Sequence, residues 1–207
     1  MKRIKGLVCA PFTAFAADGT VDLEKVALQA KFYKDNGICG VFACGTTGEG
    51  SSLTQEEKKA LLRAWSVQRG DSFVVIAFLG GTSIPDCIDL ARYAAALGLD
   101  AVAMTAPYYQ KAANVKELAC TLAEVAAAVP EMPFYYYHIP VLTHVSFPMI
   151  GRRFHQFGIC RTGLRCVLPA LASSGLQHHL HARGQEWRDG LRQVCPTGGL
   201  RTLFRPR

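Results

Sequence analysis

The sequence has no hydrophobic run long enough to cross a membrane and no cysteine pair spaced for a metal or redox site. It contains no stretch of about eighteen or more apolar residues, and its first residues lack the pattern of a signal peptide. None of its eight cysteines forms a CxxC pair. Five of them lie inside apolar segments, which is typical of reduced cysteines that pack as small core residues. These five are Cys9, Cys39, Cys44, Cys87 and Cys120. We therefore expect a cytoplasmic protein that has no membrane partner and binds no metal.

Lysine and tyrosine are absent from the last quarter of the chain, and this absence marks a boundary. Residues 1–150 carry nine Lys and four Arg against fourteen acidic residues, a net charge of −1, together with all seven Tyr. Residues 151–207 carry ten Arg, no Lys and two acidic residues, a net charge of +8. The change in composition predicts one domain over residues 1–150 and an unrelated basic tail over residues 151–207.

The basic tail has two interpretations from different classes of protein. Tails that bind nucleic acid usually mix Lys and Arg with Gly, Ser or aromatic residues, whereas this one mixes Arg with Leu, Cys, Trp and His in no detectable period. A shifted reading frame in a GC-rich gene gives such a composition, because shifted GC-rich codons encode Arg, Gly, Pro, Ala and Leu. The other interpretation is a non-enzymatic protein with a nucleic-acid-binding tail. We expect the tail to bind nucleic acid only nonspecifically, with strong dependence on salt.

Short apolar runs recur along residues 1–150 at intervals of about thirty residues, the length of one strand-plus-helix unit. Each run is continuously apolar, as expected for a parallel strand covered on both faces. The runs are residues 7–10, 40–44, 73–78, 101–104 and 133–137. Amphipathic stretches between them predict helices at 22–36, 54–68, 84–97 and 115–128. The alternation predicts an α/β parallel sheet, either a barrel or a doubly wound fold. The sequence has neither a GxGxxG motif after the first run nor a Walker lysine, which argues against nucleotide binding.

Three predicted strand ends carry residues suited to chemistry, and parallel α/β folds place their functional residues at such ends. The second run leads into Gly-Thr-Thr-Gly-Glu-Gly at residues 45–50. Its glycines permit a tight turn with exposed N–H groups, so the loop could hold a carboxylate or phosphate oxygen, or could simply be a turn. Ala-Pro-Tyr-Tyr at 106–109 follows the fourth run, and the fifth ends in Tyr-Tyr-Tyr-His-Ile-Pro at 135–140. A phenol at a strand end could carry protons or could simply pack against its neighbours.

Taken together, these motifs resemble one family. Gly-Leu-Val at 6–8 with Pro-Phe-Thr at 11–13, the 45–50 loop, Gly-Leu-Asp-Ala at 98–101 and the two tyrosine motifs are similar, in order and spacing, to the dihydrodipicolinate synthase/N-acetylneuraminate lyase superfamily. The resemblance covers about residues 4–147. It implies a TIM (β/α)8 barrel, here an incomplete barrel of about five β/α units plus an irregular tail. It also implies a homotetramer that acts on pyruvate through a lysine imine and needs no cofactor.

Within the superfamily, the resemblance favours the N-acetylneuraminate lyase branch. Dihydrodipicolinate synthases typically follow the catalytic Tyr with Asn-Val-Pro and place an Arg five residues after that Tyr, where it binds a carboxylate of the second substrate. This chain has His138-Ile139-Pro140 and, at the place of the Arg, Leu142. A leucine cannot pair with a dicarboxylic substrate. A dihydrodipicolinate synthase or another pyruvate-dependent aldolase of the superfamily is the alternative.

The resemblance to the lyases implies a retro-aldol cleavage of N-acetylneuraminate to N-acetylmannosamine and pyruvate through a lysine imine. It assigns proton transfer to Tyr137, supported by Tyr109 reaching into a neighbouring subunit. It assigns binding of the pyruvate-end carboxylate to Thr46, Thr47 and Gly48. The implied partners are therefore small molecules, sialic acid and pyruvate.

One part of that machinery is missing from the sequence. The family carries the imine lysine on the sixth strand, in a Gly-x-Lys segment about thirty residues after the catalytic Tyr, but here no lysine follows Lys116. Gly163-Leu164-Arg165 stands near that place, and an arginine stays protonated and forms no imine. Lys111 and Lys116 are the nearest lysines, in a polar loop and helix start that suggest a solvated role. No counterpart of strands six to eight is recognisable, and we expect this chain to lack lyase activity.

Overall fold

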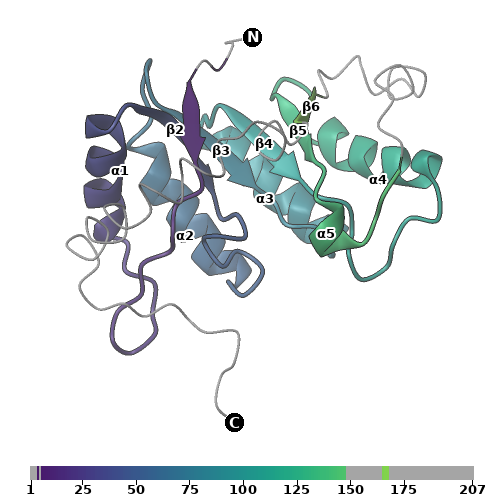
Figure 1. Cartoon of the computed structure of the whole chain (residues 1–207), viewed down its shortest axis with the longest axis horizontal. Helices are drawn as coiled ribbons and strands as arrows, with labels where there is room; N and C mark the ends of the chain where they lie inside the picture. The colour runs from purple at the N-terminus through teal and green to yellow at the C-terminus, as the bar shows by residue number, and fades with distance from the viewer. Residues whose placement is uncertain (1–3, 5, 148–164, 168–207) are drawn as a thin grey trace.

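Strands and helices alternate along the chain and form one parallel sheet, as Figure 1 shows. The computed structural model describes residues 4, 6–147 and 165–167. The strands are β1 (Leu7–Cys9), β2 (Ile38–Ala43), β3 (Val74–Phe78), β4 (Ala101–Met104), β5 (Phe134–Tyr137) and β6 (Arg165–Val167). They pair in parallel, and their order in the sheet is their order in the sequence. This is the strand order of a (β/α)8 barrel, so the predicted incomplete barrel is confirmed.

A helix follows each of the first five strands. These helices are α1 (Lys25–Asp35), α2 (Gln55–Ser66), α3 (Ile84–Ala96), α4 (Val115–Ala127) and the single turn α5 (Pro140–Thr143). The predicted capping box of α2 is present, because the Glu57 N–H donates to Thr54 Oγ1 at 3.2 Å and the Thr54 N–H donates to Glu57 Oε2 at 2.8 Å. Helix α1 begins three residues later than predicted. There the Asp22 carboxylate accepts the Glu24 N–H at 3.1 Å and forms a turn ahead of the helix.

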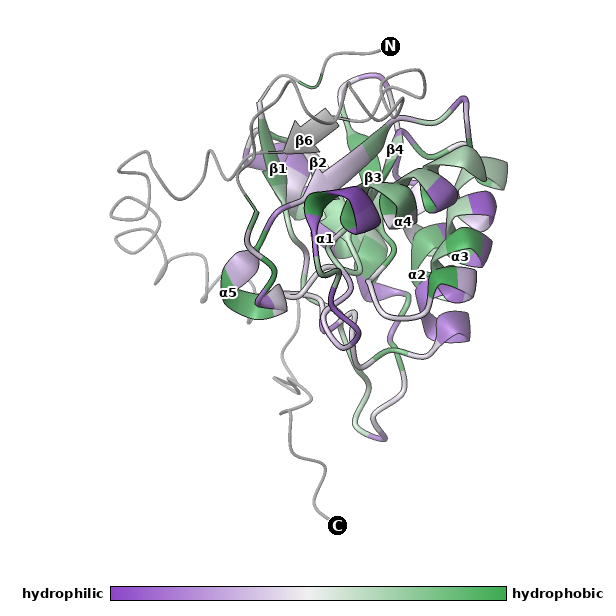
Figure 2. Cartoon of the chain, turned by 90° about the vertical axis from the view of Figure 1, so that its right-hand side faces the viewer, coloured by the Kyte–Doolittle hydropathy of each residue, from purple (hydrophilic) through white to green (hydrophobic). Residues whose placement is uncertain are grey.

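The two faces of the sheet carry different side chains, because successive residues of a strand point to opposite faces. The outer face packs against the helices through residues such as Val75, Val102, Met104 and Tyr136. Figure 2 shows α2, α3 and α4 together on this side of the strands. The inner face carries a second apolar cluster, built from Val8, Phe42, Ile76, Phe78, Ala101, Ala103, Tyr135 and Tyr137 with Ile4. The strands are continuously apolar because both faces of the sheet pack against other apolar side chains.

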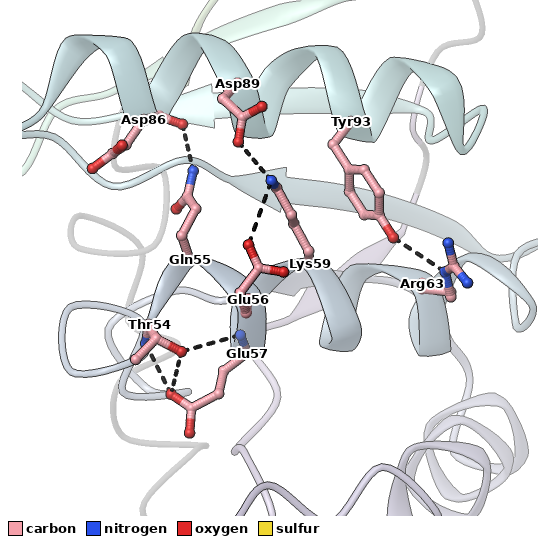
Figure 3. A network of polar contacts seen from close by, with 9 residues as sticks. All are labelled: Thr54, Gln55, Glu56, Glu57, Lys59, Arg63, Asp86, Asp89 and Tyr93. Atoms are coloured by element: carbon pink, nitrogen blue, oxygen red, sulfur yellow. Dashed lines mark hydrogen bonds and ion pairs between the residues drawn. The ribbon is translucent and has the colours of Figure 1, made fainter.

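Polar contacts align α2 with α3 on the outside of the molecule, as Figure 3 shows. Lys59 Nζ lies 2.8 Å from Asp89 Oδ2, and this ammonium group holds the pKa of the Asp89 carboxyl below its usual range. Arg63 Nε donates to the Tyr93 hydroxyl at 3.1 Å, and Gln55 Nε2 donates to a backbone carbonyl of α3 at 2.7 Å. Exposed pairs of this kind contribute little stability individually, so the main effect of the contacts is to fix the register of the two helices.

The structure adds one short strand and corrects one expectation. Arg165–Val167 extends the sheet beside β5, in a region where the sequence shows no recognisable counterpart of a sixth strand. Three residues are too short for a hydrophobic pattern to reveal a strand. Cys120 was expected in the core and is exposed, because α4 turns Leu118, Ala119 and Leu122 inward and leaves residue 120 on its outer surface. Cys44 and Cys87 are buried and unpaired as expected.

The rest of the predicted tail lies outside the described residues. The predicted division of the chain at residue 150 stays a prediction. Among the helices that the structure describes, none is both long and apolar enough to span a membrane.

Candidate active site

The loop after β2 folds back on itself at the C-terminal end of the sheet. The Gly48 and Gly50 N–H groups both donate to the Gly45 carbonyl oxygen, at 3.1 and 3.0 Å. Glu49, whose φ is +54°, donates its N–H to the Thr46 carbonyl oxygen at 3.0 Å. A Cβ atom on Gly50 would overlap the carbonyl oxygen of Cys44, so only glycine fits this turn.

The segment after β1 holds the far side of this loop. Thr13 Oγ1 donates to the Gly48 carbonyl oxygen at 2.6 Å. A Cβ atom on Gly48 would lie 2.8 Å from the Pro11 carbonyl oxygen, which is closer than side-chain carbons approach carbonyl oxygens. Gln29 of α1 in turn donates to the Phe12 carbonyl oxygen at 3.1 Å. The Pro-Phe-Thr motif at 11–13 therefore packs against the Gly-Thr-Thr-Gly loop and holds it in place.

Thr46 and Thr47 form the exposed tip of the loop. Within the described part of the chain, neither their backbone N–H groups nor their hydroxyls have a hydrogen-bond partner. Two adjacent amides and two hydroxyls are thus available as donors at one place. Donors grouped in this way suit an anionic oxygen such as that of a carboxylate. Gly48 contributes differently, because it is buried and its lack of a side chain lets the loop pack against Pro11.

Tyr137 ends β5 on the inner face of the sheet, half-buried among aromatic rings from two other strands. Its ring centroid lies 5.5 Å from that of Phe42 and 6.4 Å from that of Phe78, both in edge-to-face geometry. Its hydroxyl has no hydrogen-bond partner within residues 6–147. The phenol is therefore held by its ring and free at its oxygen, as a proton carrier needs to be.

Tyr109 lies in the loop between β4 and α4, and its side chain is 84% exposed. Among the residues that the structure describes, its hydroxyl has no hydrogen-bond partner and its ring no aromatic partner, so the single chain does not bring Tyr109 together with Tyr137. The four other predicted site residues all belong to the β2 and β5 ends of the sheet. Tyr109 is thus the one predicted site residue that lies apart from the β2 and β5 ends of the sheet.

The turn after β5 is shaped by His138 and Pro140. The Tyr136 hydroxyl lies 3.2 Å from His138 Nδ1, and burial lowers the pKa of the imidazole below its usual value. Pro140 begins α5, and His144 ends it with a positive φ of +54°. Leu142, which stands where the synthases have an arginine, is 51% exposed on this helix. The chain therefore has an apolar side chain, and no positive charge, at this position.

None of the described strands carries a lysine on either face. Lys111 and Lys116 are exposed, in agreement with their predicted solvated role. Strand β6 pairs with β5 so that Arg165 stands beside Tyr135 and Val167 beside Tyr137. Strand β6 therefore has no lysine at either position that is in register with an inward-facing tyrosine of β5.

The buried thiols near the site do not replace the missing amine. Burial raises the pKa of Cys44 to about 12 and that of Cys87 to about 11, against the opposite effect of the Lys58 ammonium. Neither thiol forms a thiolate at neutral pH, so neither is a nucleophile there. No group of three or more His, Cys, Asp or Glu side chains within the described ranges is arranged to hold a metal ion.

Sequence analysis missed Phe42 and Phe78, which build the aromatic surroundings of Tyr137. Both lie within continuously apolar runs, where the sequence marks a residue as part of a strand without telling which face it occupies. The signal that could have found them is their place at a strand end, since Phe78 is the last residue of β3 and Phe42 the second-last residue of β2.

The chain matches a model of the dihydrodipicolinate synthetase family over residues 3–151. It is 38% identical over 148 residues to the N-acetylneuraminate lyase of Danio rerio and 39% identical over 148 residues to N-acetylneuraminate lyase A of Xenopus laevis. Each alignment covers 70% of this chain and 48% of the relative. The chain therefore spans about half the length of these curated relatives.

Solved structures show the same relationship. An N-acetylneuraminate lyase from Aliivibrio salmonicida superposes with a TM-score of 0.75 and 31% identity, over 93% of this chain and 60% of that one. A dihydrodipicolinate synthase from Aquifex aeolicus superposes with a TM-score of 0.64 and 31% identity, over 69% of this chain and 48% of that one. The resemblance predicted from the five motifs is confirmed, and the chain belongs to the dihydrodipicolinate synthetase family.

Proposed function

We propose that residues 1–150 carry the carboxylate-binding and proton-transfer part of an N-acetylneuraminate lyase-type class I aldolase. We propose further that the 207-residue chain does not itself cleave N-acetylneuraminate. One observation carries both statements. The open donors of Thr46 and Thr47 and the phenol of Tyr137 stand at the C-terminal ends of β2 and β5, on the same edge of one sheet, while no described strand carries a lysine.

The loop is suited to the carboxylate of a 2-keto acid. Its two adjacent N–H groups and two hydroxyls can all donate to the same anionic group, and the hydrogen bonds within the loop keep these donors in place before the ligand arrives. Hydrogen bonds to a charged acceptor are stronger than those to a neutral one. The ligand proposed for Thr46, Thr47 and Gly48 is thus the pyruvate end of the substrate.

Tyr137 is suited to move the proton of the substrate hydroxyl. In a retro-aldol cleavage the C4 hydroxyl loses its proton as the C3–C4 bond breaks, and a phenol takes up that proton as it passes its own proton on, so its oxygen must be open to both partners. Tyr109 would act on the proton relay of a neighbouring subunit, because its side chain is exposed and lies apart from the β2 and β5 ends of the sheet. This role requires an oligomer, for which we propose the homotetramer implied by the family resemblance.

The missing element is an electron sink. When the C3–C4 bond breaks, its electron pair must pass into a protonated imine at C2, and only a neutral amine can form that imine with the ketone. Arg165 in β6 cannot do so, because a guanidinium keeps its proton. The donors and the phenol can therefore bind and orient a substrate without completing the reaction.

Two observations favour the lyase over the synthase branch. Leu142 offers no charge to a second carboxylate, and the curated relatives cited above bear the name N-acetylneuraminate lyase. A cytoplasmic location and a tail that binds nucleic acid without sequence preference complete the proposal. The net charge of +8 on residues 151–207 supports attraction to phosphates of any sequence.

Titration of the 15N-labelled chain with pyruvate tests the binding part of the proposal. Pyruvate should shift the amide signals of residues 45–48, and Thr47→Val should weaken this binding severalfold because a hydroxyl donor is lost. Thr121→Val on α4 is the matched control, since its hydroxyl bonds only to the Glu117 carbonyl oxygen within the helix. If pyruvate left the signals of residues 45–48 unchanged while shifting others, the proposed carboxylate site would be wrong.

A further inference from the structure

Phe42 contacts the 45–50 loop through its ring. It is the second-last residue of β2, and the loop begins three residues later, at Gly45. A Cβ atom built on Gly45 would lie 3.0 Å from Cδ1 and 3.2 Å from Cε1 of Phe42. Apart from Gly45 and its two chain neighbours, the three atoms nearest to that Cβ all belong to Phe42, the third being its carbonyl oxygen at 3.6 Å. The first glycine of the loop therefore rests directly on this ring.

The same ring contacts the phenol across the inner face of the sheet. The centroids of Phe42 and Tyr137 are 5.5 Å apart at an interplanar angle of 61°, the edge-to-face geometry that aromatic pairs prefer. Phe78 closes the cluster, 5.3 Å from Phe42 and 6.4 Å from Tyr137. One rigid side chain thus lies between Gly45 and Tyr137, which are 92 residues apart in the sequence.

We propose that Phe42 is a positioning residue that fixes the 45–48 loop and the Tyr137 phenol relative to each other. A planar ring cannot bend, so a shift of the loop toward Phe42 displaces the ring, and the ring displaces Tyr137. The spacing between the carboxylate donors and the proton carrier is set in this way. The catalytic meaning of this spacing rests on the proposed function, whereas the mechanical coupling does not.

Phe78 is the natural comparison for Phe42. Both are phenylalanines on the inner face, and both have edge contacts with Tyr137. Only Phe42 also reaches Gly45. Leucine in place of either residue keeps an apolar side chain of similar length but removes the planar ring. The Phe42→Leu change should therefore disturb the loop and Tyr137 together, whereas the Phe78→Leu change should disturb Tyr137 more than the loop, because Phe78 reaches the loop only through Phe42.

The coupling is tested by NMR on the full chain with labelled glycine, threonine and tyrosine. Gly45→Ala forces the Phe42 ring to give way by a few tenths of an ångström, so it should shift the ring signals of Tyr137. In the Phe42→Leu background, the same Gly45→Ala change should shift them by less than half as much. Tyr33 and Tyr93 pack elsewhere, and their unchanged signals would indicate an intact fold. Phe42→Tyr retains the ring and should restore the coupling.

The proposal is wrong if Gly45→Ala leaves Tyr137 unaffected, or shifts it equally with and without the Phe42 ring. It is also wrong if Phe78→Leu moves the amide signals of Thr46 and Thr47 as much as Phe42→Leu does. These readouts need no bound ligand. A chain that has the coupling but does not bind pyruvate would refute the proposed function and leave the positioning role of Phe42 intact.

Discussion

Gly48 and Gly50 allow the tight turn of the 45–50 loop because they have no side chain. A Cβ atom on Gly48 would lie 2.8 Å from the Pro11 carbonyl oxygen, and one on Gly50 would overlap the Cys44 carbonyl oxygen. The loop can therefore fold tightly enough for its inner hydrogen bonds to form, with Thr46 and Thr47 exposed at its tip. The proposed binding of a carboxylate therefore depends on these two glycines having no side chain.

Gly50→Ala should lower the free energy of unfolding by about 3 kcal/mol or more, because the new methyl group would overlap the Cys44 carbonyl oxygen and the loop backbone must move. Gly70→Ala is the control, since nothing lies within 4 Å of a Cβ there. Urea unfolding followed by tryptophan fluorescence measures both changes. Equal effects of the two substitutions would contradict the account of the loop.

His138 gives the turn after β5 a dependence on pH. Burial lowers the pKa of its imidazole below the ordinary value of 6.5, so the unfolded chain binds this proton more readily than the folded one. The contribution of His138 to the free energy of unfolding is therefore complete above pH 6.5 and declines as the pH falls below it. His138→Gln should reduce the loss of stability between neutral pH and about pH 5. A loss of the same size in the variant would contradict this assignment.

Among the elements, those that could be predicted from sequence are those whose pattern is long. Each of the first five strands is a continuous apolar run, and α2 begins with a capping box that the sequence spells out in Thr54 and Glu57. Strand β6 has only three residues, and its pairing with β5 is a tertiary contact that no local pattern encodes. The inner aromatic cluster escaped prediction for the same reason, since the partners Phe42 and Tyr137 come from distant strands.

For the candidate site, too, local sequence patterns could be predicted and tertiary contacts could not. The loop and the tyrosines could be named as candidates because glycine, threonine and tyrosine motifs stand out at strand ends. The sequence could not show which of these groups are exposed and which have hydrogen-bond or packing partners. Thr46 and Thr47 have no hydrogen-bond partners for their donors among the described residues. Tyr109 is exposed, and Tyr137 packs against two aromatic rings. Each of these properties depends on how separate elements pack.

Thr54→Ala should cost about 1 kcal/mol of the free energy of unfolding, because α2 loses the hydroxyl that accepts the Glu57 N–H. Thr121→Ala removes a hydroxyl inside α4 that bonds only to the carbonyl of the preceding turn, and alanine is a better helix former, so its effect should be near zero. Thermal unfolding of both variants makes the comparison. A cost for Thr121→Ala as large as that for Thr54→Ala would show that the cap is not the cause.

At the scale of the whole molecule, the chain combines a well-formed arc of parallel strands with an incomplete set of chemical groups. The sheet supplies the loop proposed to bind a carboxylate from β2 and the phenol from β5, and β6 continues it without an amine. In the proposed function, binding and chemistry are thus separated in this chain. A family member with the loop, the phenol and an imine lysine would have both, whereas this chain is expected to have only the first.

The central claim is that the chain offers a site for a 2-keto acid but no amine to bond it. The most direct measurement is incubation of the purified chain with pyruvate and sodium borohydride, followed by mass spectrometry of the intact protein. The Danio rerio N-acetylneuraminate lyase, treated in parallel, is the comparison. Our account predicts an unmodified mass for this chain and no release of N-acetylmannosamine from N-acetylneuraminate. A stable pyruvyl adduct on any of its nine lysines, together with release of N-acetylmannosamine, would contradict it.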